Sequence, residues 1–212
     1  MEMSDEGRAL WETAQALARA RPPVSGRPAV LPMLFFTDPD RTPRPWEAAA
    51  RLPAGSGVVY RHFGADDARQ VAERLRAATR AAGAALLIGA DAQLAEAVGA
   101  DGLHLPERDL AHAVRLRRPG WVVTGAVHTF EAARAARGLD GLVLSPIFPA
   151  GGASARRAAL GLEVLRAAAE LSTPIIALGG VDARSAPRLI GTGAAGLAAV
   201  GAIQGAFAPA DA

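Results

Sequence analysis

The feature that most constrains the fold is a repeated alternation, from residue 29 onward, of short apolar runs with amphipathic segments. The apolar runs are Val30–Phe36, Gly57–Arg61, Ala84–Ile88, Gly102–Leu105, Trp121–Ala126, Gly141–Leu144, Pro174–Leu178 and Gly196–Val200. They are continuously apolar, as parallel strands buried on both faces should be. The segments between them are rich in Ala and Arg and predict helices: Pro45–Leu52, Asp66–Ala82, Glu131–Arg137, Gly161–Leu171 and Ala183–Ile190.

Eight strand–helix units in 212 residues predict an α/β fold, a single (β/α)8 TIM barrel near the lower size limit of that fold. A flavodoxin-like sheet would use five units and leave three over. Leu10, Trp11 and Leu17 lie near helical spacing and predict an extra helix over Asp5–Ala20. We therefore expect an N-terminal helix and proline-rich linker in residues 1–28, the barrel in 29–207 and a tail in 208–212.

The composition excludes several classes of protein. The 23 basic and 21 acidic residues nearly balance, which gives no electrostatic case for nucleic acid. The chain has no Cys and no Lys, so disulfides, cysteine zinc sites, Schiff bases and Walker loops are excluded. The start is acidic, and the apolar runs are too short to cross a bilayer. We expect a cytoplasmic protein that binds neither nucleic acid nor membrane; whether it forms a homo-oligomer stays open.

Two glycine-containing segments predict a phosphate site. In TIM barrels the active site lies at the C-terminal ends of the strands, and the loops after strands seven and eight commonly bind phosphate. Gly179 and Gly180 follow the seventh run, where Asp182 is expected to start a helix, whereas Val200 ends the eighth run and Gly201 follows it. Backbone N–H groups at helix starts attract anions. The alternative is that each glycine only makes a tight turn, but their matching positions favour phosphate.

The loop after the sixth run contains two prolines and then an arginine pair, Arg156 and Arg157. Two guanidinium groups can bind a diphosphate bidentately, and long loops at this face often act as lids. The slightly favoured alternative is a solvated surface pair.

Two histidines lie at or near strand ends. His128 lies just beyond the fifth run, where it can act as a general acid or base near neutral pH or can cap the next helix. His104 alternates with Leu103 and Leu105. It either points into the barrel or is a packed histidine with its polar atoms satisfied, and the packed interpretation is favoured.

Four short motifs occur in order at the expected strand ends: GADGLHL (Gly99–Leu105), SPIFP (Ser145–Pro149), LGGV (Leu178–Val181) and GAAGLAAVGAI (Gly193–Ile203). Together they resemble the thiamine phosphate synthase / thiazole tautomerase (TenI-like) superfamily over about Leu31 to Phe207. The resemblance implies a TIM barrel of thiamine biosynthesis. The synthase joins a hydroxymethylpyrimidine diphosphate to a thiazole phosphate with magnesium and releases pyrophosphate. The tautomerase isomerises a thiazole phosphate carboxylate.

The half of the site that would hold diphosphate and magnesium departs from the family pattern. At the end of the second run, the synthase pattern Gln-x-Arg-acidic-Lys becomes Val59–Phe63, in which only Arg61 remains. After the third run, Asn-Asp becomes Gly-Ala, and Asp91 follows one position late. After the fourth run, Asp109 matches the other magnesium-binding aspartate. Magnesium is therefore a weakly supported cofactor, and Arg61, Arg156 and Arg157 are the cations that can replace what is missing.

The thiazole phosphate half is better preserved. The glycine loops are kept, although Gly201 replaces the usual serine. His128 matches the histidine to which the tautomerase branch assigns the acid–base role. Three hypotheses follow: a synthase with a relaxed magnesium site, a tautomerase-like isomerase that uses His128, and a non-catalytic protein that binds a phosphorylated thiamine precursor. Phosphate-binding barrels such as tryptophan-pathway enzymes rank low because their catalytic lysine is absent here.

Overall fold

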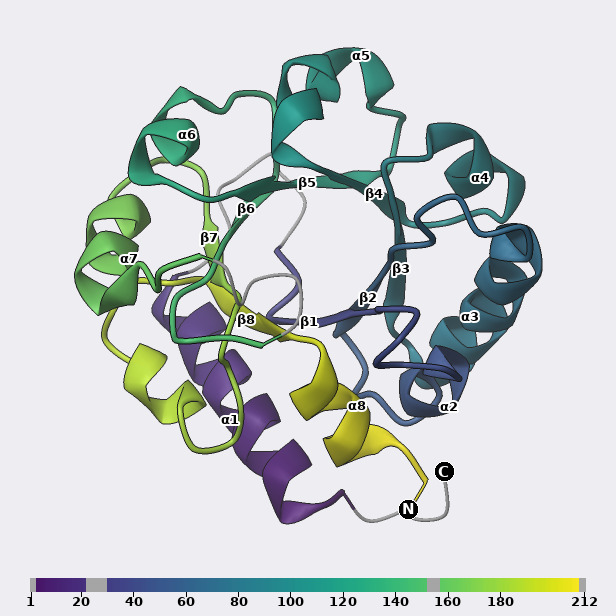
Figure 1. Cartoon of the computed structure of the whole chain (residues 1–212), viewed down its shortest axis with the longest axis horizontal. Helices are drawn as coiled ribbons and strands as arrows, with labels where there is room; N and C mark the ends of the chain where they lie inside the picture. The colour runs from purple at the N-terminus through teal and green to yellow at the C-terminus, as the bar shows by residue number, and fades with distance from the viewer. Residues whose placement is uncertain (1–2, 22–29, 152–156, 210–212) are drawn as a thin grey trace.

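The computed structural model describes residues 3–21, 30–151 and 157–209, and its chain folds around a closed barrel (Figure 1). Most of the predicted linker, the end of the predicted tail and Arg156 lie outside these residues. The strands are β1 (Met33–Phe36), β2 (Gly57–Tyr60), β3 (Ala85–Gly89), β4 (Gly102–Leu105), β5 (Val122–Val127), β6 (Gly141–Leu144), β7 (Ile175–Ala177) and β8 (Gly196–Ala199).

Each strand pairs in parallel with the next, and β8 pairs with β1 to close the barrel. The helices outside it are α2 (Pro45–Ala49), α3 (Ala68–Ala82), α4 (Ala92–Ala97), α5 (Ala113–Leu116), α6 (Phe130–Ala135), α7 (Gly161–Ala169) and α8 (Gly201–Phe207), with 3-10 helices η1 (Glu107–His112) and η3 (Ala186–Leu189). The predicted (β/α)8 barrel is confirmed.

The strands are buried on both faces, which explains their continuous apolar sequence. In β1, Leu34 and Phe36 belong to an inner cluster with side chains from β2, β3, β6, β7 and β8. Met33 and Phe35 belong to the larger cluster that includes buried side chains of the helices. Successive side chains of a strand point to opposite faces, so both clusters are filled by one apolar run.

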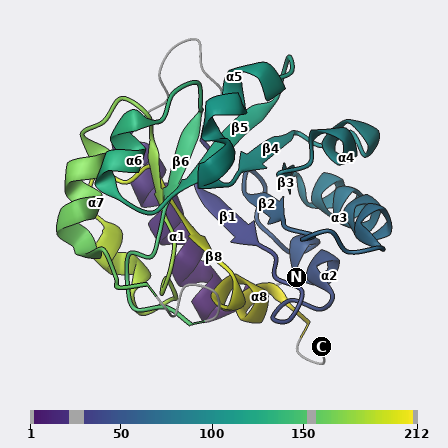
Figure 2. The same ribbon diagram turned by 45° about the horizontal axis from the view of Figure 1, so that its top comes forward.

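The predicted N-terminal helix is α1 (Asp5–Ala20), and it packs against β8, β1, α8 and η3 (Figures 1 and 2). Ser4 caps it by accepting a hydrogen bond from the Gly7 backbone N–H (3.1 Å). The same hydroxyl donates to the Ala206 carbonyl (2.8 Å), which ties the start of α1 to α8. Leu10 and Leu17 are buried, so α1 completes the outer layer beside β8.

The helix predicted over Ala183–Ile190 is wrong, because only a turn and the short η3 form there. The Ser185 backbone N–H donates to Asp182 Oδ1 (2.7 Å), and the Asp182 N–H donates to Ser185 Oγ (2.9 Å). Such local side-chain bonds compete with helix formation, and Pro187 removes a further backbone donor. The short η3 packs against α1.

Within the described ranges, no helix is long and apolar enough to cross a membrane.

Candidate functional site

A cavity of about 700 Å³ opens at the C-terminal ends of the strands. Its lining comes mainly from the ends of β1 to β6 and the loops that follow them: Phe36, Arg61, His62, Phe63, Gly64, Gly89, Ala90, Asp91, His104, Pro106, Arg108, Ala126, His128, Val143, Ser145, Arg157 and Leu178. The lining contains three arginines and one carboxylate, that of Asp91. A cleft with such an excess of positive charge attracts anionic ligands.

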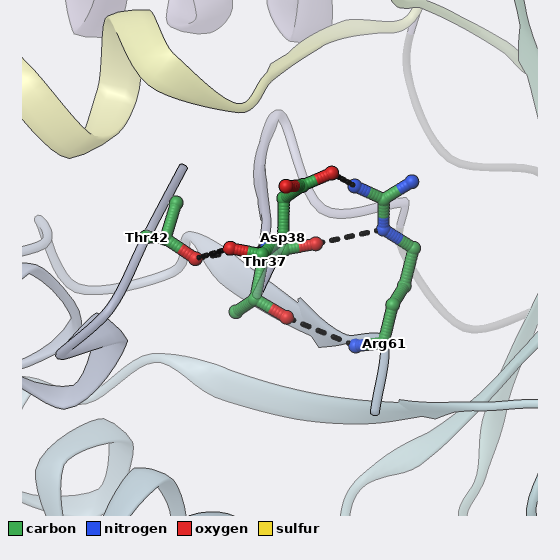
Figure 3. Close-up of polar contacts among 4 residues, drawn as sticks. All are labelled: Thr37, Asp38, Thr42 and Arg61. Atoms are coloured by element: carbon green, nitrogen blue, oxygen red, sulfur yellow. Dashed lines mark hydrogen bonds and ion pairs between the residues drawn. The ribbon is translucent and has the colours of Figure 1, made fainter. Parts of the chain in front are cut away.

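Arg61 follows β2 and is held by contacts to the end of β1 (Figure 3). Its backbone N–H donates to Thr37 Oγ1 (2.9 Å), and its Nε donates to the Thr37 carbonyl (2.8 Å). Its Nη2 lies 3.5 Å from Asp38 Oδ2. The Phe36 and Phe63 ring centroids lie 5.5 and 5.4 Å from Cζ. These contacts fix the guanidinium in the cavity wall before any ligand arrives.

Thr42 fixes the carboxylate partner of Arg61 (Figure 3). The Asp38 backbone N–H donates to Thr42 Oγ1, and the same hydroxyl donates to the Asp38 carbonyl, both at 2.8 Å. Burial lowers the pKa of Arg61, the Asp38 charge opposes that shift, and the Arg41 charge adds to it. Sequence analysis missed Thr37, Asp38 and Thr42. Their only signal was that polar residues directly follow the first apolar run.

His128 follows β5, and hydrogen bonds fix its ring. Its Nδ1 lies 2.9 Å from the Ser145 carbonyl oxygen, which can only accept, so Nδ1 carries the proton of this bond. In the neutral ring, Nε2 is then the free acceptor. The His128 backbone N–H donates to Glu107 Oε2 (2.7 Å). Thr129 caps α6, so His128 is not the helix cap.

His104, in β4, is both packed and part of the cavity lining. Its Nδ1 lies 2.9 Å from Thr124 Oγ1, and its ring stands edge-on to Phe36 with centroids 4.9 Å apart. Burial lowers the pKa of His104 to about 3, and the Arg61 charge adds to the shift. His104 is therefore neutral at physiological pH.

The lowered pKa of His104 makes the folded state sensitive to acid. The ordinary histidine pKa is 6.5, so the unfolded chain takes up this proton first and stability falls as pH drops from about 6.5 toward 3. At about 1.4 kcal/mol per pH unit, the loss at pH 5 is about 2 kcal/mol. We expect His104→Gln, which keeps a partner for Thr124, to remove this loss. Urea unfolding at pH 7.5 and 5 measures it.

The matched control for that substitution is His112→Gln, because His112 is exposed on η1. It should retain the acid sensitivity of the unchanged chain. An equal fall in unfolding free energy in His104→Gln and the unchanged chain would show that His104 does not carry the effect.

Gly179 and Gly180 lie against the loop after β6. Gly179 has φ +94°, and a Cβ there would lie 2.7 Å from Pro146 Cα. Gly180 has φ +64°, and a Cβ there would lie 2.4 Å from the Pro149 carbonyl oxygen. Close packing and turn geometry thus account for both glycines, and phosphate binding by them stays a prediction. At the next strand end, Val200 is the N-cap residue of α8 and Gly201 its first residue.

The remaining candidates are Arg157, Asp91 and Asp109. Arg157 is exposed and lines the cavity. Asp91 also lines it, with Oδ1 accepting from the Leu94 N–H (2.8 Å) and Oδ2 3.6 Å from His62 Nε2. Asp109 lies in η1 with Oδ2 3.6 Å from Arg108 Nε, and it is not among the residues that line the cavity.

Sequence comparison decides the family. The sequence model of a family described as thiamine monophosphate synthase matches residues 39–203. The chain belongs to this family. The resemblance inferred from the four motifs is thereby confirmed. The family is one of thiamine biosynthesis enzymes.

Individual relatives agree with that assignment. The chain is 35% identical over 188 residues to thiamine-phosphate synthase from Chlorobium luteolum, a match that covers 85% of this chain and 88% of the relative. It is 37% identical over 168 residues to thiamine-phosphate synthase from Xanthomonas campestris pv. campestris, with 76% and 79% covered.

Two solved structures show the same barrel fold. Thiamine phosphate pyrophosphorylase from Pyrococcus furiosus matches with a TM-score of 0.67 at 24% identity, covering 82% of this chain and 91% of that one. FabK from Thermotoga maritima matches with a TM-score of 0.64 at 16% identity, covering 81% of this chain and 58% of that one.

Magnesium, which the synthase resemblance implies, has limited support from the carboxylates of this family member. Mg²⁺ is commonly held by one or two carboxylates together with substrate phosphates. Asp91 faces the cavity but already caps α4, and Asp109 does not line the cavity. Among the described residues, no group of three potential ligands gathers in one place. The two-carboxylate site of the resemblance is not assembled here, and no step below is routed through a metal.

Proposed function

We propose that the chain is a thiamine-phosphate synthase that acts in the cytoplasm and joins a pyrimidine diphosphate to a thiazole phosphate. The observation that carries the proposal is the immobilised Arg61 in an arginine-rich cavity at the strand ends. Relatives about 35% identical that carry the name thiamine-phosphate synthase support it. An anion-binding cavity fits two substrates that both carry phosphate groups.

The proposed reaction forms one bond and breaks one. The thiazole ring nitrogen bonds to the methylene carbon of the pyrimidine, and the carbon–oxygen bond to the diphosphate breaks. The electron pair of that bond leaves with pyrophosphate, so negative charge grows on the leaving group. A fixed guanidinium stabilises such charge without reorganising during the reaction. We assign this role to Arg61, with Arg156 and Arg157 as further diphosphate ligands.

The thiazole phosphate is proposed to bind at the ends of β7 and β8, next to the end of β1 in the closed barrel. Backbone N–H groups of Gly179, Gly180, Val200 and Gly201 would bind its phosphate, since N–H groups at the end of a strand suit an anion. The neutral His104 and the adjacent Phe36 form an uncharged part of the cavity lining, on which a heteroaromatic ring can pack.

A thiazole tautomerase is the second candidate, and the Ser145–His128 hydrogen bond favours it. Tautomerisation needs a group that removes a proton at one atom and returns it at another. The bond to the Ser145 carbonyl holds the proton on Nδ1 and leaves Nε2 to act as the base. Proton transfer of this kind requires neither the diphosphate site nor a second carboxylate.

Product detection by mass spectrometry tests the proposal. The purified chain is incubated with the pyrimidine diphosphate, the thiazole phosphate and Mg²⁺, beside an active synthase as control. We expect thiamine phosphate, and omission of either substrate should remove it. A chain that gives no product while the control enzyme does would refute synthase activity. Isomerisation of the thiazole phosphate carboxylate would then identify a tautomerase, and ligand-induced thermal stabilisation without turnover would identify a binding protein.

A further inference from the structure

Arg41 reaches from the loop after β1 to the start of α8. The backbone N–H groups of Arg41 (3.1 Å) and Thr42 (2.8 Å) donate to the Asp38 carbonyl and close this loop into a compact turn. The Arg41 guanidinium then lies beside Gly201. A Cβ built on Gly201 would be 3.0 Å from Arg41 Nη2 and 3.9 Å from Cζ. Arg41 therefore occupies space into which a side chain at position 201 would point.

Gly201 is not required by its own backbone. It is absent from the positions with positive φ, so an L-residue can adopt its conformation. What distinguishes the position is the neighbouring guanidinium, whereas the family resemblance expects a serine there. The two features fit together: the hydroxyl is missing, and a cationic group with several N–H donors stands where that side chain would reach.

Arg41 is exposed to solvent. None of the ion pairs found in the described part of the chain involves Arg41, whereas Arg44, three residues later, pairs with Glu47 at 3.1 Å. Arg41 is close enough to Arg61 for its charge to help lower the pKa of Arg61. Arg61 has the Asp38 carboxylate as its partner, whereas the neighbouring Arg41 guanidinium has no carboxylate of the described residues within ion-pair distance and can pair with a bound anion.

We propose that Arg41 is a further ligand-binding residue, whose guanidinium binds the phosphate monoester of the thiazole substrate in place of a hydroxyl at position 201. The inference rests on the proposed function for the identity of the ligand. It adds a side chain from the loop after β1 to a phosphate site otherwise made of backbone groups. Arginine forms planar, charge-assisted hydrogen bonds with phosphate.

Calorimetric titration with two ligands tests this role: the thiazole phosphate and the corresponding thiazole alcohol, which lacks the phosphate. We expect Arg41→Ala to raise the Kd of the thiazole phosphate by about tenfold to a hundredfold, as loss of a charge-assisted hydrogen bond does. The Kd of the alcohol should not change. Arg44→Ala removes the same charge three residues away and should leave both values unchanged. Arg41→Gln repeats the test with a side chain of similar length.

Substitution of Gly201 supplies an independent arm of the test. Gly201→Ser should weaken phosphate binding in the unchanged chain, because the new side chain displaces the guanidinium. In the Arg41→Ala background the same substitution should recover part of the lost affinity, because the hydroxyl can now reach the phosphate. This opposite sign is not expected if Arg41 only supports the loop.

The possible results separate this inference from the proposed function. Equal phosphate affinity in Arg41→Ala and Arg44→Ala overturns the role of Arg41 and leaves the proposed function standing. Equal weakening of the phosphate and the alcohol by Arg41→Ala also overturns it, because the effect is then not on phosphate recognition. An unchanged chain that binds neither ligand refutes both proposals.

Discussion

Replacing Arg61 by Ala should lower kcat/KM for thiamine phosphate formation by about a hundredfold to a thousandfold, the range found when one preorganised donor to developing charge is removed. The loss should fall mainly on kcat, because charge on the leaving pyrophosphate is greatest in the transition state. Steady-state assays with the pyrimidine diphosphate as the varied substrate measure both constants. Arg61→Lys should remain strongly impaired, because an ammonium group cannot reproduce the planar fork or the Nε bond to the Thr37 carbonyl.

The control for Arg61 is Arg69→Ala, which removes an exposed arginine that pairs with Glu73 on α3. It should keep kcat/KM within about twofold, because an exposed ion pair of this kind contributes little. Circular dichroism should show both variants folded, since Arg61 lies beyond the end of β2 and its hydrogen bonds go to Thr37 and Asp38, which follow β1. A fall of less than threefold in folded Arg61→Ala would contradict the assigned role.

The fold could be predicted closely wherever the burial of an element determines its pattern of apolar residues. Both faces of each strand are covered, so every strand is a continuous apolar run, and the eight predicted runs coincide with β1 to β8 to within a few residues at each end. The helix prediction for the segment after β7 was wrong because the structure there depends on hydrogen bonds between Asp182 and Ser185. The Ala and Arg content of that segment suggested a helix, but it does not show that the Asp182–Ser185 hydrogen bonds form instead.

The site was less predictable because its side chains meet across the fold. Arg61 could be singled out because it matches the arginine of the family pattern at the end of an apolar run, but its contacts with Thr37 and Asp38 depend on the β1–β2 pairing. The Arg41–Gly201 contact joins the two ends of the barrel sequence through the β1–β8 closure. Gly179 had two interpretations in the sequence, and only its approach to Pro146 shows that packing already requires a glycine there.

Replacing His128 by Ala should lower thiazole tautomerisation by this chain about a hundredfold to ten-thousandfold, the usual contribution of a positioned general acid or base. Thiamine phosphate formation should fall by no more than about tenfold, because the proposed bond exchange needs no proton transfer at Nε2. His112→Ala, an exposed histidine on η1, is the control and should affect neither reaction. Nuclear magnetic resonance of the thiazole ring follows the isomerisation, and mass spectrometry follows the condensation. An unchanged isomerisation rate would remove His128 from the mechanism, whereas equal losses in both reactions would mean that its contact with the Ser145 carbonyl shapes the whole site.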